Sequence, residues 1–268
     1  MIHFIPTPIG NLEDVTMRSL KLLSSSEIVF CEDTRVAKKL IHLLKEKFDI
    51  QTDIKEFISL HSHNEKDVVS KLDKAIFEKN VIYLSDAGMP CISDPGCFLI
   101  DFCQKNSIEY EVLPGANALT VAYASSGFCK KEFLFYGFLP HKGSQREKEL
   151  LDVMYSGYIS ILYESPHRLL KLFEQICNID ENREIFLTKE LTKMYQKNFK
   201  ATAKEIYLKL KNQNIKGEWV VVINSDTKKE GNITVEDIKK LDIPKKQMAK
   251  MIAKITGKSP KECYNELL

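Results

Sequence analysis

No apolar run in this sequence is long enough to cross a membrane without interruption. The longest stretch free of charged residues, 112–129, approaches the roughly 20 residues of a membrane span, but Pro114, Gly115 and Asn117 interrupt it, as do two serines. The N-terminus also lacks the basic start and apolar core of a secretion signal. We therefore expect this stretch to form a buried loop and helix, in a cytoplasmic protein with no membrane partner.

Neither the number nor the spacing of the cysteines fits a disulfide framework or a metal site. There are seven, an odd number, and Cys91, Cys97 and Cys103 recur every six residues rather than in the C-x-x-C spacing of zinc ligands. We predict free thiols packed as small apolar side chains, and no metal site.

The chain as a whole lacks a strong net charge, at +2, but its charge is unevenly distributed. Residues 228–268 contain ten Lys against six Asp or Glu, whereas the preceding residues carry a net charge of −2. This asymmetry favours an anionic partner for the C-terminal segment, although a solvated basic helix face explains it equally well.

Strand-like apolar runs alternate with helical patterns through the first 115 residues. We expect strands at 3–6, 27–31, 56–60, 81–85 and 110–113, and helices at 16–23, 34–44, 65–79 and 98–106. This alternation predicts an α/β fold whose N-terminal domain, residues 1–116, contains a parallel five-stranded sheet with helices on both faces.

The order of predicted strands and helices changes in the second half of the chain. We expect a helix at 116–126, strands at 132–140, 157–165, 184–190 and 219–224, and helices beginning near Pro166 and at 203–212. These predict a second α/β domain with a mixed sheet at residues 117–230.

The remaining residues, 231–268, are predicted to form a short helical extension. Met248, Ile252 and Ile255 lie on one helical stripe, and Gly257 ends that helix. A further helix is expected to begin after Ser259, with a proline in its first turn.

Three loops at the expected strand ends combine glycine and proline in an unusual way. They are PTPIGN (6–11), SDAGMPCISDPG (85–96) and LPGANA (113–118), and none contains the familiar G-x-G-x-x-G or G-x-x-x-x-G-K-[ST] pattern. Because the carboxyl ends of parallel strands share one edge of a sheet, we expect the loops to converge on a ligand.

The residues of these loops indicate the charge of that ligand. The loops contain no Lys, and Asp86 and Asp94 would repel phosphate. A cationic or neutral adenosine derivative such as S-adenosylmethionine therefore fits better than a nucleoside triphosphate. Turn formation is the alternative role for each Asp.

Seven motifs carry a resemblance to a known family. In order along the chain they are PTPIGNLEDVTMRSL, CEDTR, SDAGMPCISDPG, LPGANAL, GFLP, ESPHRL and KELTK. They resemble the signatures of the ribosomal RNA small subunit methyltransferase I family, a branch of the tetrapyrrole methylase superfamily, over essentially the whole chain. The resemblance implies two α/β domains of tetrapyrrole-methylase type, S-adenosylmethionine in the cleft between them, and a homodimer. The implied reaction is methylation of the 2′-oxygen of a cytidine ribose in 16S ribosomal RNA.

The resemblance also implies which residues contact S-adenosylmethionine. The matching loop positions are Ile9, Gly10, Asp86, Gly88, Asn117 and Ala118, and the matching strand positions of the second domain are Tyr163, Glu164, Leu187 and Trp219. The chain departs from the family pattern at Met89, where threonine is usual, and at Tyr195, where histidine is common.

A ribose hydroxyl is weakly acidic, so a base beside it would assist the transfer. Acids and histidines within the motifs supply the candidates, which are Glu32, Asp33, His61, His63, Glu164, His167 and Glu190. We take Glu32, Asp33 and Glu164 as the catalytic candidates. Helix capping by Asp33, an internal ion pair of Glu164, and catalysis by positioning alone are the alternatives.

The expected macromolecular partner is small-subunit ribosomal RNA or the 30S ribosomal subunit. Basic residues around the cleft would contact its phosphates, and those we expect to do so are Arg35, Lys38, Lys39, Arg146, Arg168 and Lys193. Two other functions remain open: a tetrapyrrole (precorrin or uroporphyrinogen) C-methyltransferase, and a non-catalytic RNA-binding assembly factor.

Overall fold

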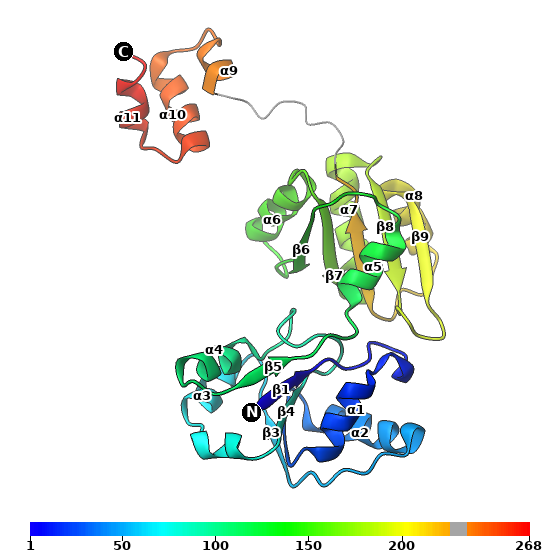
Figure 1. Ribbon diagram of the computed structural model, residues 1–268. Helices are drawn as coiled ribbons and strands as arrows, with labels where there is room; N and C mark the ends of the chain where they lie inside the picture. The colour runs from blue at the N-terminus through cyan, green and yellow to red at the C-terminus, as the bar shows by residue number, and fades with distance from the viewer. Residues whose placement is uncertain (226–234) are drawn as a thin grey trace. The chain divides into compact units, whose positions relative to one another are not determined.

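The computed structural model describes residues 1–225 and 235–268, which belong to two units, Met1–Ser225 and Asp226–Leu268 (Figure 1). The larger unit contains two five-stranded sheets, and the smaller unit contains helices. The predicted boundary between residues 230 and 231 lies outside the described residues.

The first sheet confirms the predicted parallel arrangement. Its strands are β1 (Ile2–Ile5), β2 (Ile28–Cys31), β3 (Glu56–Ser59), β4 (Val81–Leu84) and β5 (Tyr110–Val112), in the order β3-β2-β4-β1-β5 with every pair parallel. Alternation along β4 directs Tyr83 into the core on one face and Ile82 into the core on the other. Both faces are therefore buried, which explains the nearly continuous apolar runs of these strands.

Helices cover both faces of this sheet. The helices α1 (Met17–Ser25) and α2 (Thr34–Phe48) pack on the face of Ile82, whereas α3 (Glu65–Ser70), the 3₁₀ helix η2 (Lys74–Glu78) and α4 (Cys97–Lys105) pack on the face of Tyr83. The single helix predicted at 65–79 is wrong, because Asp73 caps a new turn by accepting the N–H of Ala75 at 3.0 Å.

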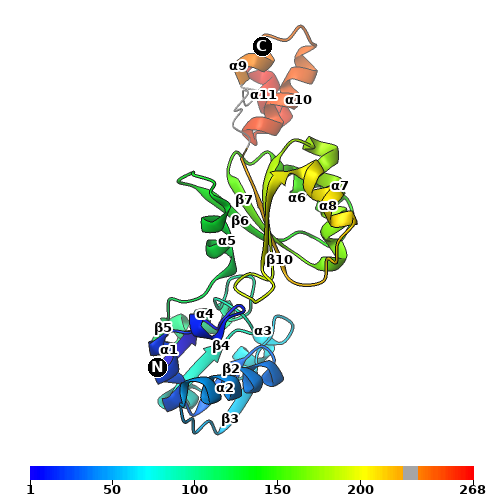
Figure 2. The same cartoon turned by 90° about the vertical axis from the view of Figure 1, so that its right-hand side faces the viewer.

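The second sheet is mixed, as predicted. Its strands are β6 (Phe133–Phe138), β7 (Ile159–Glu164), β8 (Glu184–Lys189), β9 (Lys197–Thr202) and β10 (Trp219–Ile223), in the order β6-β7-β10-β8-β9. Only β6 and β7 pair in parallel. Figure 2 shows α5 (Ala118–Ser126) on one face, and α6 (Ser144–Met154), α7 (Pro166–Asp180) and α8 (Ala203–Lys211) on the other.

The smaller unit contains α9 (Val235–Lys239), α10 (Lys245–Thr256) and α11 (Pro260–Asn265) around a small core. Gly257 ends α10 in the left-handed conformation at φ 71°, and the Ser259 hydroxyl caps α11, as predicted. All three residues of the predicted stripe lie on α10, where Met248 and Ile252 are buried and Ile255 is half exposed.

Two further expectations concern the whole chain. All seven cysteines are free thiols, but Cys97 and Cys129 are exposed rather than packed in the core. Across residues 1–225 and 235–268, no helix combines the length and apolarity that a membrane crossing requires.

Candidate functional site

Loops from the two sheets of the larger unit meet around a cavity of about 380 Å³. Its wall includes the loops after β1, β4 and β5, the end of β7 and the start of β10. The lining residues are Ile9, Ala87, Gly88, Met89, Ile92, Ser93, Asp94, Asn117, Ala118, Phe138, Tyr163, Glu164, Ser165, Pro166, Leu191, Gly217, Glu218, Trp219 and Val220. The volume lies within the range of about 300–1,000 Å³ that small-molecule sites occupy.

Most of the expected cofactor contacts lie in this wall. Those that line the cavity are Ile9, Gly88, Asn117, Ala118, Tyr163, Glu164 and Trp219. The other three, Gly10, Asp86 and Leu187, do not line it. Leu187 is fully buried in the core beside α7 and α8. It lies on the opposite face of the second sheet from the cavity residue Val220.

A short backbone pairing fixes the first two loops to each other. The N–H of Thr7 donates to the carbonyl of Gly88 at 2.9 Å, and the N–H of Gly88 donates back at 3.0 Å. Gly88 has φ +91°, and a Cβ there would lie 3.2 Å from a methyl carbon of Ile9. A side chain at this position would therefore be strained and would crowd the cavity wall.

Gly10 does not line the cavity and instead lies against the loop after β8. A Cβ on Gly10 would lie 2.5 Å from Cγ of Lys193 and 2.8 Å from the carbonyl oxygen of Leu191. The loop after β1 therefore packs directly against the loop after β8, and Figure 2 shows these two loops side by side. Gly10 allows this close approach, which sets the position of Ile9 and Leu191 in the cavity wall.

The charged residues of the cavity wall are all acidic. They are Asp94, Glu164 and Glu218, and no Lys or Arg of the described residues lines the cavity. Glu218 is paired with Lys193 at 2.9 Å. The wall therefore lacks the basic side chains that a phosphate needs.

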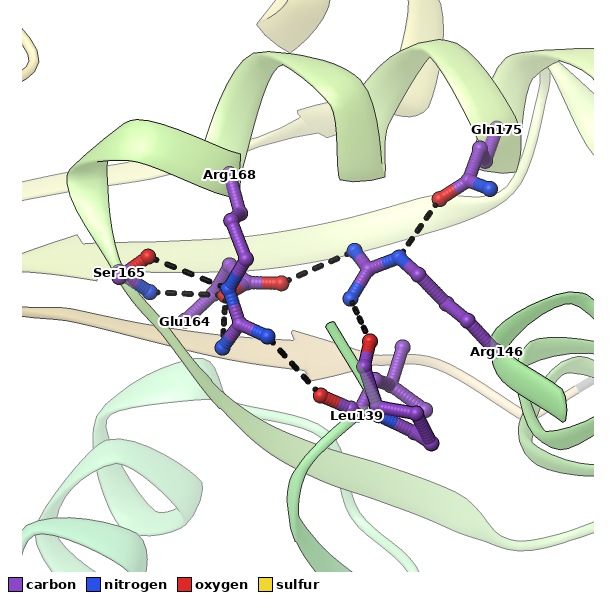
Figure 3. Close-up of polar contacts among 7 residues, drawn as sticks. Leu139, Arg146, Glu164, Ser165, Arg168 and Gln175 are labelled. Atoms are coloured by element: carbon purple, nitrogen blue, oxygen red, sulfur yellow. Dashed lines mark hydrogen bonds and ion pairs between the residues drawn. The ribbon is translucent and has the colours of Figure 1, made fainter. Parts of the chain in front are cut away.

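Glu164 is neutralised by two arginines inside the second domain (Figure 3). Its carboxylate accepts Nη2 of Arg146 at 3.0 Å, pairs with Nη2 of Arg168 at 2.7 Å, and accepts the N–H of Ser165 at 2.8 Å. Only 1 % of the Glu164 side chain is exposed. Both oxygens of this carboxylate are therefore occupied by partners within the second domain.

The same cluster determines the roles of its arginines. Arg146 is 1 % exposed, and its remaining donors bind the carbonyl of Pro140 and the side chain of Gln175, each at 3.0 Å. It is therefore enclosed by protein and cannot reach a phosphate. Arg168 is 15 % exposed and also donates to the carbonyl of Leu139, so the cluster joins β6, β7 and α7 (Figure 3).

The other expected catalytic acids follow β2 and lie beside the loop after β4. Asp33 caps α2 and binds the Arg35 guanidinium, which holds the pKa of this carboxyl well below its usual range. Asp86 accepts the N–H of Asp33 at 3.1 Å. Burial, followed by repulsion from Asp86 and Asp33, raises the pKa of Glu32, which does not line the cavity.

Asp94 is the carboxylate that lines the cavity without a counter-charge. Burial, followed by repulsion from Glu32 and Asp86, raises its pKa to about 7. No residue that the structure describes donates a hydrogen bond to it. Its neighbours Cys91 and Ser93 both have left-handed backbone, at φ 68° and 65°, and such strain is concentrated at functional sites.

The sequence alone did not mark Asp94 as a catalytic candidate. It drew attention only as an acid of a Gly- and Pro-rich loop that could bind ribose hydroxyls. Its usefulness as a base depends on burial and on repulsion from Glu32, which approaches from the segment after β2, and from Asp86 of its own loop. Only the tertiary structure reveals that proximity.

The remaining expected RNA contacts lie on the protein surface. Arg35, Lys38 and Lys39 are exposed on the first turns of α2. Lys38 lies over the Phe57 ring at 5.0 Å, and Lys193 is partly exposed beside Glu190 and Glu218. The structure thus leaves a basic strip on α2 open to a partner.

A family model described as Tetrapyrrole (Corrin/Porphyrin) Methylases matches residues 1–207. A protein of Campylobacter fetus subsp. fetus named ribosomal RNA small subunit methyltransferase I is 51 % identical over the full length of both chains. A protein of the same name from Helicobacter pylori strain J99 is 40 % identical, covering 100 % of this chain and 97 % of its own.

Two solved structures have the same fold at low sequence identity. A cobalt precorrin-4 methyltransferase of cobalamin biosynthesis has a TM-score of 0.60 at 17 % identity, covering 83 % of this chain and 94 % of its own. Uroporphyrin-III C-methyl transferase from Thermus thermophilus, complexed with S-adenosylhomocysteine, has a TM-score of 0.57 at 12 % identity, covering 82 % and 96 %.

Proposed function

Since the chain belongs to the tetrapyrrole methylase family and to its ribosomal RNA small subunit methyltransferase I branch, we propose that it methylates the 2′-oxygen of a cytidine ribose in 16S ribosomal RNA. The chain is a methyltransferase that uses S-adenosylmethionine. The RNA substrate is supported by the names of relatives that match this chain from end to end. We further propose that it acts in the cytoplasm as a homodimer, on the rRNA or the 30S subunit.

The observation that carries the proposal is a cavity whose wall has no basic side chain among the described residues. A sulfonium carries positive charge, and Asp94 offers it a carboxylate that has no counter-charge. Ile9, Tyr163 and Val220 supply the apolar surface that an adenosine group needs. Asn117 and Gly88 place polar backbone groups in the same cavity wall. When bound, S-adenosylmethionine supplies an electrophilic methyl group, whose transfer to the hydroxyl oxygen breaks the carbon–sulfur bond.

The proton of the attacking hydroxyl requires an acceptor, and we assign this role to Asp94. It lines the cavity, has no hydrogen-bond donor among the described residues, and faces like charges from Glu32 and Asp86. Asp33 and Glu164, by contrast, are held by arginines. The remaining contribution of the chain is to align the two reactants, which is worth up to about 7–11 kcal/mol for well-oriented groups.

The experiment that tests the function offers the protein two classes of methyl acceptor. Purified protein is incubated with methyl-labelled S-adenosylmethionine and either protein-free small-subunit rRNA, assembled small subunits, uroporphyrinogen or a precorrin. The proposal predicts label in RNA and none in either tetrapyrrole. Label in a tetrapyrrole but not in RNA would contradict it.

A calorimetric titration addresses the non-catalytic alternative. An assembly factor that merely retains the fold would bind rRNA without measurable affinity for S-adenosylmethionine. We expect a measurable dissociation constant for the cofactor, weakened when Gly88→Leu fills the cavity wall next to Ile9.

A further inference from the structure

The smaller unit contains a second concave site, between α10 and α11. Its cavity of about 400 Å³ is lined by Lys246, Ala249, Lys250, Pro260, Lys261 and Tyr264. Three of these six residues are lysines, and none is acidic. We call this site the lysine cavity.

The three lysines of the lysine cavity have no counter-charge among the described residues. Residues 235–268 contain eight Lys against five Asp or Glu, and ion pairs involve other lysines of the unit. These pairs join Lys239 with Glu236, Lys240 with Asp237, and Lys258 with Glu266. Of the five lysines without an ion pair in these residues, three line the lysine cavity, and the other two are Lys245 and Lys254.

The walls of the lysine cavity are held in place by packing. Lys246 and Lys250 lie one helical turn apart on α10, adjacent to the buried residues Met248 and Ala249. Lys261 lies in the first turn of α11, whose buried residue Cys263 packs against α10. The reciprocal capping bonds between Ser259 and Glu262 fix the start of α11, so the lysines are arranged before any ligand binds.

We infer that the lysine cavity binds phosphates of the RNA substrate, which makes the smaller unit a second RNA-binding element of the protein. The inference rests on the proposed RNA substrate. Three uncompensated lysines around one concavity supply the positive charge that binds backbone phosphates, and the exposed ring of Tyr264 beside them offers a surface for stacking a base. A membrane surface fits less well, because the lysines line a concavity rather than border an apolar helix face.

The test compares two triple variants of the full chain with the same change in net charge. One is Lys246→Gln, Lys250→Gln and Lys261→Gln, in the lysine cavity. The matched control is Lys239→Gln, Lys240→Gln and Lys258→Gln, on the same unit but outside it. Affinity for protein-free small-subunit rRNA is measured from about 50 to about 200 mM KCl.

The cavity variant is expected to bind rRNA about tenfold more weakly, and its log–log salt slope is expected to fall by about 2 to 3 because three phosphate contacts are lost. The control should change the slope by less than about 1. Both variants should keep the wild-type affinity for S-adenosylmethionine in calorimetry, because that site lies in the larger unit.

Equal salt slopes for the two triple variants would overturn the inference while leaving the proposed methyl transfer intact. Wild-type protein that neither binds nor methylates rRNA would overturn both. A cavity variant that loses binding to phosphatidylserine vesicles but keeps its affinity for rRNA would show that the lysine cavity serves a membrane surface instead.

Discussion

The carboxylates in and beside the cavity are the same chemical group, but their charged neighbours differ. Asp33 faces Arg35, Glu164 lies between two arginines, and Asp94 faces only like charge. A general base is most effective when its pKa lies near the working pH. The environment, rather than the residue type, therefore distinguishes Asp94 as the proton acceptor.

Asp94→Asn removes this acceptor while preserving the shape of the side chain. We expect kcat for methyl transfer to fall by about 100-fold or more, within the range of general base catalysis. Affinity for S-adenosylmethionine, measured by calorimetry, should weaken by about tenfold at most, since only one partly exposed attraction is lost.

The same residue predicts how the rate depends on pH. A carboxyl accepts a proton only when ionised, so the rate should rise with pH, reach half its maximum at the pKa of about 7 and become constant above it. The titratable groups that face Asp94 are Glu32, Tyr83, Asp86, Cys91 and Tyr163. A bound cation lowers the pKa, so the pH of half-maximal rate should lie at or below 7.

Asp86→Asn is the control for this profile, because it makes the same chemical change on a residue outside the cavity wall. It should keep the rise and plateau, shifted to lower pH because repulsion from Asp86 helps to raise the pKa of Asp94, whereas Asp94→Asn should lose them. If Asp94→Asn retains the wild-type pH profile, Asp94 is not the base.

The arginine cluster of Glu164 predicts a loss of stability. Glu164→Gln leaves Arg146 buried without its counter-charge, and breaking a buried pair in this way costs about 3–5 kcal/mol. Urea unfolding followed by tryptophan fluorescence should report this decrease in the free energy of unfolding. Lys204→Gln breaks the exposed pair with Glu181 and should leave the unfolding midpoint close to that of the wild type; equal midpoints for the two variants would contradict the stabilising role.

At the scale of helices, strands and loops, local patterns predicted most of what positions the site. The strands of the first sheet and the three loops after them follow from short-range alternation and from Gly and Pro positions. The helix α6 and the strand β9 were not predicted, because five of the eleven residues of α6 are charged and β9 is an edge strand with Lys197 and Lys200 on it.

Residues whose role depends on distant partners could not be assigned from the sequence. Arg146 was expected at the surface, since nothing in its own segment indicates that Glu164 and Gln175 will enclose it. Gly10 was expected to touch the cofactor, although its close contact is with Leu191 and Lys193 of the second domain. Each outcome depends on how the two sheets face one another.

Gly10→Ala tests the contact between the two loops. The new Cβ would clash with Cγ of Lys193 and the carbonyl of Leu191, and overpacking of this kind costs about 1–3 kcal/mol. We expect weaker binding of S-adenosylmethionine in calorimetry, because Ile9 and Leu191 shift in the cavity wall. Lys193→Ala in the same chain should restore part of the affinity by removing Cγ; additive effects would show that the two loops do not press on each other.

At the scale of the whole molecule, the two units divide the proposed task. The larger unit supplies an acidic cavity for a cationic methyl donor, with a basic strip on α2. The smaller unit supplies the lysine cavity for the RNA backbone. Substrate attraction and methyl transfer thus use surfaces of opposite charge, which keeps phosphate away from the acidic cavity.

The most direct test of the central claim is mass spectrometry of nucleosides from small-subunit rRNA, before and after incubation with the protein and S-adenosylmethionine. The account predicts a new 2′-O-methylcytidine at one site, with no gain in base-methylated nucleosides, and its absence with the Asp94→Asn protein in the same time. A methyl group on a base, or no new methylated nucleoside with the wild-type protein, would contradict it.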